Sequence, residues 1–131
     1  MVVIFVVAHV PLASALDACV RHVLGKDPQL HLLDIEPNEF ASQSSPLLAA
    51  AIVAADQGDG VLLLTDLPGA TPSNIAVEAS SLAHAQGVSC SVLGGVNASM
   101  LLKAINYRNA ALDVVIEKAL TGATQAVLRV D

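Results

Sequence analysis

The sequence predicts an α/β protein in which helices cover both faces of a doubly wound, mostly parallel β-sheet. Apolar residues make up 54% of the chain and charged residues only 14%, so much of the chain must be buried. Continuous apolar runs, typical of strands buried on both faces, recur along the chain. They alternate with segments of helical periodicity, and this alternation is the pattern of a parallel sheet with crossover helices.

The first half of the chain contains two strand–helix units. Residues 2–8 form an unbroken, β-branched apolar run, and residues 12–24 carry apolar residues at helical spacing. The segment "LHLLDI", residues 30–35, predicts a second strand. The following "SSPLLAAAIVAAD" predicts a helix with Ser45 as its N-cap and Pro46 at its first position.

The second half continues the alternation and ends in a strand of a different kind. Strands are predicted at residues 60–66 and 89–95, and helices at about 72–86, 97–105 and 110–121. Gly122 stands where the last helix should end. The closing segment "TQAVLRV", residues 124–130, alternates in hydropathy, which predicts an edge strand with one face in solvent, and we expect it to run antiparallel.

Composition limits both the organisation and the partners of the chain. The 131 residues suit a single domain, residues 1–131, because no linker, repeat or low-complexity tract divides them. A net charge of −6 with scattered basic residues argues against nucleic acid and against an anionic membrane surface as partners. No signal peptide or membrane-spanning segment is predicted, and the two cysteines lack metal or redox spacing, so a cytoplasmic protein is expected.

Four polar residues end the four strands of the predicted parallel sheet: His9, Asp34, Asp66 and Asn97. The carboxyl ends of parallel strands meet at one edge of the sheet, which is where ligands bind in such folds. We therefore expect these side chains to converge, although they come from distant parts of the sequence. Asp34 either lines this site or only ends a strand, and Asn97 is expected to cap a helix at its floor.

The segment "TDLPGATPSN" follows the third strand and carries the strongest local signal. Asp66 ends the strand, Gly69 permits a tight turn, and Thr71 before Pro72 is a suitable helix N-cap. The backbone N–H groups are expected to face an open space beside His9, and helix N-termini of this kind bind phosphate or an oxyanion. The residues expected to supply these groups are Gly69, Ala70, Thr71 and Ser73.

His9 has several possible roles: a hydrogen-bonded core residue, a metal ligand, a general base or a nucleophile. A metal site with one histidine and two aspartates lacks any recognised ligand spacing, so no metal or cofactor is expected. A general base would need Thr71 or Ser73 as nucleophile without the usual elbow motif. A nucleophilic histidine needs a carboxylate to orient its ring and amides to receive a phosphoryl group, and Asp66 and the loop offer both.

These residues resemble the mannose-family enzyme IIA domains of the bacterial phosphoenolpyruvate:sugar phosphotransferase system. The resemblance rests on His9, "TDLPGATPSN" and "GGVNASMLL", and it covers essentially the whole chain. It implies that His9 accepts a phosphoryl group from the phosphocarrier HPr and passes it to an enzyme IIB acceptor. It also implies that Asp66 holds the other ring nitrogen, that Thr71 lies beside the phosphoryl group, and that the C-terminal strand is exchanged in a homodimer.

Two departures and two alternative functions accompany this resemblance. Val10 follows His9 where family members often have glycine, and Leu67-Pro68 follow Asp66 where an aromatic residue is common. A regulatory module that reports its phosphorylation state without sugar transport, or a phosphotransfer subunit of dihydroxyacetone kinase, would use the same histidine. A receiver-like domain phosphorylated on Asp66 is disfavoured, because such domains need an acidic pair after the first strand.

Overall fold

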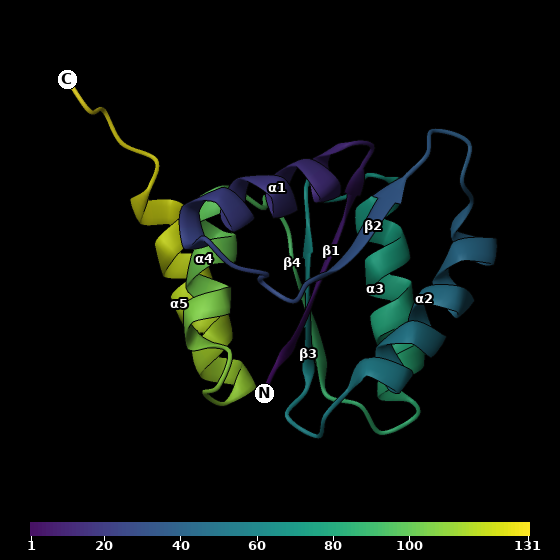
Figure 1. Cartoon of the computed structure of the whole chain (residues 1–131). Helices are drawn as coiled ribbons and strands as arrows, with labels where there is room; N and C mark the ends of the chain where they lie inside the picture. The colour runs from purple at the N-terminus through teal and green to yellow at the C-terminus, as the bar shows by residue number, and fades with distance from the viewer.

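The computed structural model describes residues 1–131, and its elements alternate between strand and helix until two final helices (Figure 1). None of the helices combines the length and the apolar character needed to cross a membrane. The elements in chain order are β1 (Val3–His9), α1 (Leu12–Leu24), β2 (His31–Ile35), α2 (Ala41–Ala55), β3 (Val61–Thr65), α3 (Thr71–His84), β4 (Cys90–Leu93), α4 (Ala98–Tyr107) and α5 (Leu112–Gln125).

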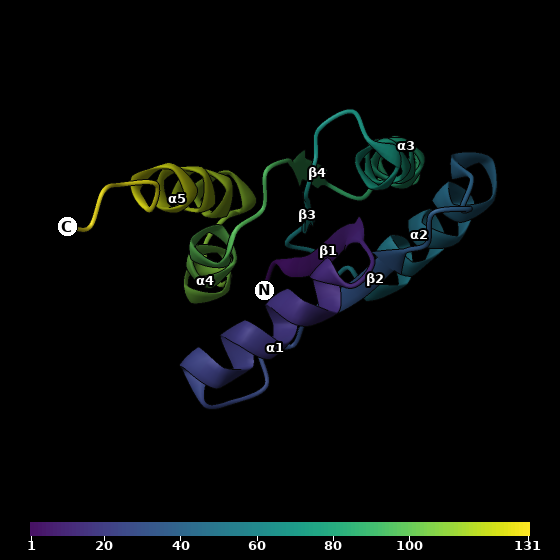
Figure 2. The same cartoon turned by 90° about the horizontal axis from the view of Figure 1, so that it is seen from above.

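The four strands form one sheet in the order β2-β1-β3-β4, and every neighbouring pair is parallel. Helices α2 and α3 cover one face, while α1, α4 and α5 lie on the other (Figure 2). The predicted doubly wound α/β fold is confirmed. Because β1 and β3 are the central strands, the residues that leave them, His9 and Asp66, come from adjacent strands.

The central strand β1 is buried on both faces, as its unbroken apolar run predicts. Its even-numbered residues, such as Ile4 and Val6, pack in a cluster with α1, α4 and α5. Its odd-numbered residues, such as Phe5 and Val7, pack in a second cluster with α2 and α3. This alternation follows from the two-residue period of a strand, and it fixes the end of β1 rigidly between two layers.

The prediction of a C-terminal strand is wrong for this chain's own sheet. Thr124 and Gln125 belong to α5, and residues 126–131 form no strand. Helix α5 carries the chain end away from the sheet (Figure 1), so the tail pairs with neither edge strand of its own chain. Its apolar side chains are consequently exposed: 80% for Val127, 63% for Leu128 and 92% for Val130.

Two predicted helix boundaries also need correction. Helix α2 begins at Ala41 with Phe40 as its N-cap, rather than at Pro46 with Ser45 as its N-cap, because the turn after Phe40 closes with hydrogen bonds from the N–H groups of Gln43 and Ser44 to the Phe40 carbonyl. Pro46 therefore lies inside the helix. Helix α5 continues through Gly122, where a Cβ atom would lie only 2.4 Å from the Cγ of Lys103 on α4, so this glycine serves close helix packing.

Candidate functional site

His9 and Asp66 form a directly hydrogen-bonded pair at the carboxyl ends of the two central strands. The His9 Nδ1 atom lies 2.6 Å from Asp66 Oδ2, and the backbone N–H of His9 donates to the same oxygen at 2.9 Å. The carboxylate thus binds both the main chain and the ring of one residue. This double contact fixes the ring relative to the sheet, as predicted from the strand ends.

The Asp66 carboxylate is held in its ionised form by the groups around it. Its side chain is only 9% exposed. Burial alone raises the pKa of Asp66, but hydrogen bonds from the His9 N–H, the His9 ring and the Leu67 N–H outweigh burial and lower this pKa below its usual value. Asp66 is therefore an acceptor that remains charged when the ring beside it gains positive charge.

The pairing leaves one ring nitrogen available for chemistry. Because a carboxylate only accepts hydrogen bonds, His9 Nδ1 must carry the hydrogen that it shares with Asp66. In the neutral ring the lone pair is then on Nε2, which accepts no hydrogen bond from the chain. The His9 side chain is 45% exposed, so Nε2 can be reached by an incoming electrophile.

The loop after Asp66 turns sharply at Gly69 before α3 begins. Gly69 has a φ of +86°, a conformation that residues with a Cβ atom rarely adopt. The turn closes when the Ala70 N–H donates to the Leu67 carbonyl at 3.1 Å. The prediction of a free amide at Ala70 is therefore wrong, because the turn itself uses that hydrogen.

Helix α3 begins one residue away from the predicted cap. Ala70 occupies the N-cap position, Thr71 is the first helical residue, and no side chain caps this end. The prediction of Thr71 as N-cap is wrong for this reason. The N–H groups of Gly69, Thr71 and Ser73 donate to no acceptor in the chain, since the first helical bond here runs from Asn74 N–H to the Ala70 carbonyl. Three of the four predicted amides thus remain open at a helix N-terminus.

Sequence reasoning missed the contact that holds this loop from behind. Gly94 packs so closely against Pro68 that a Cβ at position 94 would lie 2.6 Å from the proline Cγ. The N–H of Gly95 donates to the Asp66 carbonyl at 2.7 Å, and the N–H of Val96 donates to the Thr65 carbonyl at 2.8 Å. The paired glycines of "GGVN" were the available signal for such a close approach.

The other two strand-end residues form hydrogen bonds with partners other than His9 and Asp66. Asn97 caps α4, as predicted: its Oδ1 accepts from the Met100 N–H at 2.8 Å, and its Nδ2 donates to the Ala123 carbonyl of α5 at 3.2 Å. Asp34 accepts hydrogen bonds from the backbone N–H and the hydroxyl of Ser14 on α1. Asp34 therefore anchors α1 to the sheet, and Asn97 joins the last two helices.

The groups gathered at this site suit transfer chemistry at a ring nitrogen. No group of three or more His, Cys, Asp or Glu side chains is placed to hold a metal ion. What the site offers is one lone pair on an oriented ring, a buried carboxylate behind it, and open amides at a nearby helix N-terminus. These are the groups that a nucleophile and an anionic group in transfer require.

The fold and this pair place the chain among α/β proteins that present a carboxylate-oriented histidine at the carboxyl end of a parallel sheet. Residues 3–120 match the family described as the PTS system fructose IIA component, and the chain belongs to this family. Components of this kind are phosphotransfer proteins of the sugar phosphotransferase system. The resemblance to mannose-family enzyme IIA domains drawn from the sequence is confirmed.

Solved structures of low sequence identity share the fold along nearly the whole chain. Phosphotransferase component EIIA from Streptococcus agalactiae has a TM-score of 0.86 at 22% identity, over 98% of this chain and 97% of that chain. The mannose/sorbose-specific IIA subunit from Enterococcus faecalis also has a TM-score of 0.86 at 22% identity, over 99% and 95% of the two chains.

A third similar structure comes from a protein with a different description. A sigma-54 interaction domain protein from Enterococcus faecalis has a TM-score of 0.79 at 17% identity, over 96% of this chain and 93% of that chain. At these identities the structures establish the fold alone. No curated sequence matches this chain.

Proposed function

We propose that this chain is a phosphoryl carrier that accepts a phosphoryl group from phosphorylated HPr on His9 and passes it to an enzyme IIB acceptor. The observation that carries the proposal is the 2.6 Å contact between His9 Nδ1 and Asp66, which leaves the lone pair on Nε2 of a side chain that is 45% exposed. Membership of the IIA family supports transfer from HPr to this chain and from this chain to an enzyme IIB acceptor. We expect this exchange to take place in the cytoplasm. The net charge of −6 argues against nucleic acid as a further partner.

The step exchanges one nitrogen–phosphorus bond for another. The His9 Nε2 lone pair attacks phosphorus as the bond from phosphorus to the donor's ring nitrogen breaks, and the donor imidazole keeps the released electron pair. His9 retains the hydrogen on Nδ1, so no net proton is transferred. The ionised Asp66 stabilises the positive charge that develops on the His9 ring during attack.

The start of α3 supplies the groups that receive the phosphoryl oxygens in this proposal. The open N–H groups of Gly69, Thr71 and Ser73, with the hydroxyl of the exposed Thr71, lie in the turn after Asp66 and in the first turn of α3. A helix N-terminus stabilises negative charge through these amides and through its dipole. Ala70 and Asn97 are assigned supporting roles, because Ala70 closes the turn and Asn97 caps α4 beside the loop of Gly95.

The proposal is tested by phosphorylation with enzyme I, HPr and radiolabelled phosphoenolpyruvate. The expected product is an acid-labile, base-stable phosphate on the chain. His9→Ala abolishes labelling, whereas His22→Ala, which removes an exposed histidine of α1, leaves it unchanged. Label retained in the His9 variant would contradict the mechanism.

A regulatory role is the second candidate, favoured by the fold shared with a sigma-54 interaction domain protein. Phosphorylation adds about −1.5 to −2 charges at neutral pH, enough for a partner to distinguish the two states. The two functions differ in the acceptor. Loss of label on mixing the phosphorylated chain with an enzyme IIB identifies the carrier, and loss only to a dihydroxyacetone kinase subunit identifies that branch. A label stable to both supports the regulatory role.

Homodimer formation is also proposed for this chain. The exposed apolar side chains of Val127, Leu128 and Val130 support it, because an uncovered segment of this kind gains stability when a second copy covers it. Sedimentation of the full chain is expected to give a dimer, and removal of residues 126–131 a monomer. A full chain that remains monomeric at high concentration would contradict this.

A further inference from the structure

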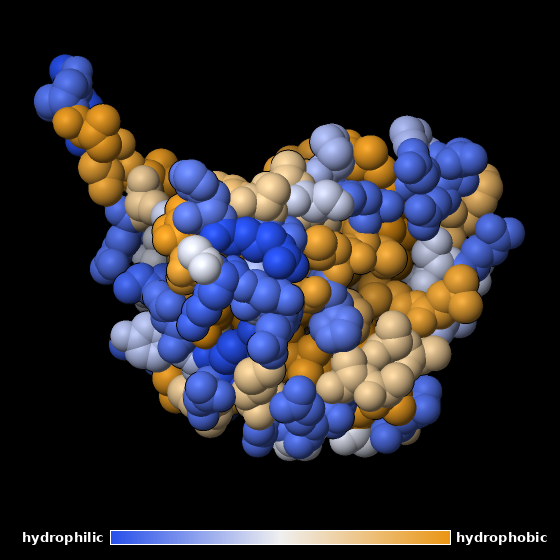
Figure 3. All heavy atoms as spheres, in the orientation of Figure 1, coloured by the Kyte–Doolittle hydropathy of each residue, from blue (hydrophilic) through white to orange (hydrophobic).

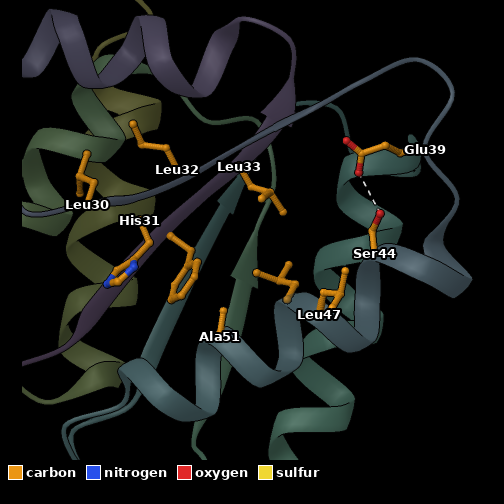
Figure 4. A pocket seen from close by; sticks show the side chains of 10 residues that line it. Leu30, His31, Leu32, Leu33, Glu39, Ser44, Leu47 and Ala51 are labelled. Atoms are coloured by element: carbon orange, nitrogen blue, oxygen red, sulfur yellow. Dashed lines mark hydrogen bonds between the residues drawn. The ribbon is translucent and has the colours of Figure 1, made fainter.

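An apolar groove lies between the edge strand β2 and helix α2, outside the site around His9. It has a volume of about 550 Å³ and appears as an orange hollow right of centre in Figure 3. Leu33 of β2 and Leu47 of α2 point toward it in Figure 4. The residues of its walls that matter here are His31, Leu33, Leu47, Leu48 and Ala51.

Strand β2 offers backbone groups along this groove, because it is the last strand on its side of the sheet. It pairs with β1 from His31 to Ile35, so its backbone groups on the outer side have no strand partner. Such an edge is a template for an additional strand. The opposite edge, β4, borders a hollow with the polar residues His84, Ser89 and Asp113 in its walls.

Helix α2 extends the apolar layer beyond the last strand. Leu47 is 74% exposed although its neighbour Leu48 is buried in the core. Beneath the groove, the Phe5 ring stacks on the His31 ring with centroids 4.5 Å apart. One further strand beside β2 would place alternate side chains against Leu47 and Ala51. The apolar lining therefore suits a strand with apolar residues on the face that meets α2.

The charge at one end of the groove favours a basic group. Glu39 accepts a hydrogen bond from the Ser44 hydroxyl at 2.8 Å (dashed in Figure 4) and one from the Glu36 N–H at 3.1 Å. These two bonds hold the carboxylate in place. No lysine or arginine lines the groove, and Glu36 adds a second negative charge close by in the sequence.

We propose that this groove docks an extended segment of a partner protein, in which apolar residues alternate with polar ones and a lysine or arginine stands at the end that meets Glu39. The segment adds a strand to β2, so main-chain hydrogen bonds supply affinity, and the leucine wall and Glu39 supply specificity. The proposal does not depend on His9, because neither His9 nor Asp66 lines the groove and no groove residue forms a hydrogen bond with either of them.

A blocked peptide, Lys-Val-Thr-Leu-Thr-Val-Lys, is a direct probe for the full ¹⁵N-labelled chain. A lysine at each end allows either strand direction to present one to Glu39. Binding is expected to shift amide signals of residues 31–34 and of Leu47. It should be about tenfold tighter than binding of Lys-Thr-Val-Val-Leu-Thr-Lys, which has the same composition without alternation. The peptide with glutamate in place of lysine should also bind about tenfold more weakly.

Two variants test the assigned roles without disturbing the core. Leu47→Asp, at an exposed position, should weaken binding about tenfold, and the matched control Leu120→Asp, at a 44% exposed position on α5, should leave it unchanged. Glu39→Gln keeps a hydrogen-bond acceptor for Ser44 and should remove the preference for lysine over glutamate.

Several outcomes would overturn the docking proposal. They are equal binding of the scrambled peptide, amide shifts located elsewhere, or tight binding of a small apolar dye at the groove with no binding of the peptide. A peptide of this chain's residues 124–131 that binds there as tightly would make a second copy the occupant instead. Each result is obtained without phosphorylation, so it is independent of the transfer activity of His9.

Discussion

The carboxyl ends of β1 and β3 and the groove beside β2 differ in how many of their polar groups are already used. At the strand ends, Asp66 accepts three hydrogen bonds and the Ala70 amide closes a turn, so only the His9 ring nitrogen Nε2 and a few amides remain open. Along β2, the backbone groups on the outer side have no strand partner, and Leu47 of the neighbouring α2 is exposed. A reacting group needs a fixed orientation, whereas a docking surface needs unused contacts.

Asp66→Asn is expected to have the largest effect on the strand-end site. The amide keeps the size of the side chain but loses the charge that stabilises the ring during attack. Phosphoryl transfer to His9 should slow by about 100-fold, the size of effect seen when one electrostatic contact to a transition state is removed. Rapid-quench measurement with phosphorylated HPr gives the rate. Unchanged transfer with an unchanged circular dichroism spectrum would remove Asp66 from this role.

Gly94→Ala tests whether the loop behind Asp66 is held as tightly as the contacts indicate. The added Cβ would lie 2.6 Å from the Pro68 Cγ, so either the loop or the β4 exit must shift. Overpacking of this kind costs about 1–3 kcal/mol of unfolding free energy. Urea denaturation measures it, and Pro68→Ala in the same chain should restore part of the loss. No recovery in the double variant would place the strain elsewhere.

The pH dependence of stability is expected to show the smallest effect, and only at acid pH. The pKa of Asp66 is lower in the folded chain than in the unfolded chain, so its contribution to stability is present above the unfolded pKa and lost as pH falls through the folded pKa. Urea unfolding from pH 6 downward should therefore show a steeper acid loss in the unmodified chain than in Asp66→Asn. Identical acid slopes would contradict the lowered pKa.

The apolar runs in the sequence predicted much of the site, because the position of the site depends on where the strands end. The apolar run of residues 2–8 ends at a lone imidazole, and the run of residues 60–66 ends at Asp66. In a parallel sheet both must emerge at the same edge. The alternation of units determined the fold class in the same way, since unbroken apolar strands require helices on both faces.

Contacts between distant segments were not predictable from such patterns. Ser14 of α1 donates hydrogen bonds to Asp34 of β2. Gly94 packs on Pro68 because the segments that leave β3 and β4 approach each other only in the folded sheet. The same limit explains the error at Ala70. The sequence does not show that the Ala70 N–H group has a hydrogen-bond acceptor, because that acceptor, the Leu67 carbonyl, is placed only by the folded turn.

The sequence by itself determined that the apolar runs of β1 and β3 are buried, that His9 and Asp66 stand at strand ends, and that a glycine turn precedes α3. Only the tertiary structure decided that β1 and β3 are neighbours, which brings His9 Nδ1 within 2.6 Å of Asp66. It also decided that the alternating tail finds no edge in its own sheet. The physical reason is that periodicity records which face of a segment is apolar, whereas the partner of that face depends on how all the segments pack together.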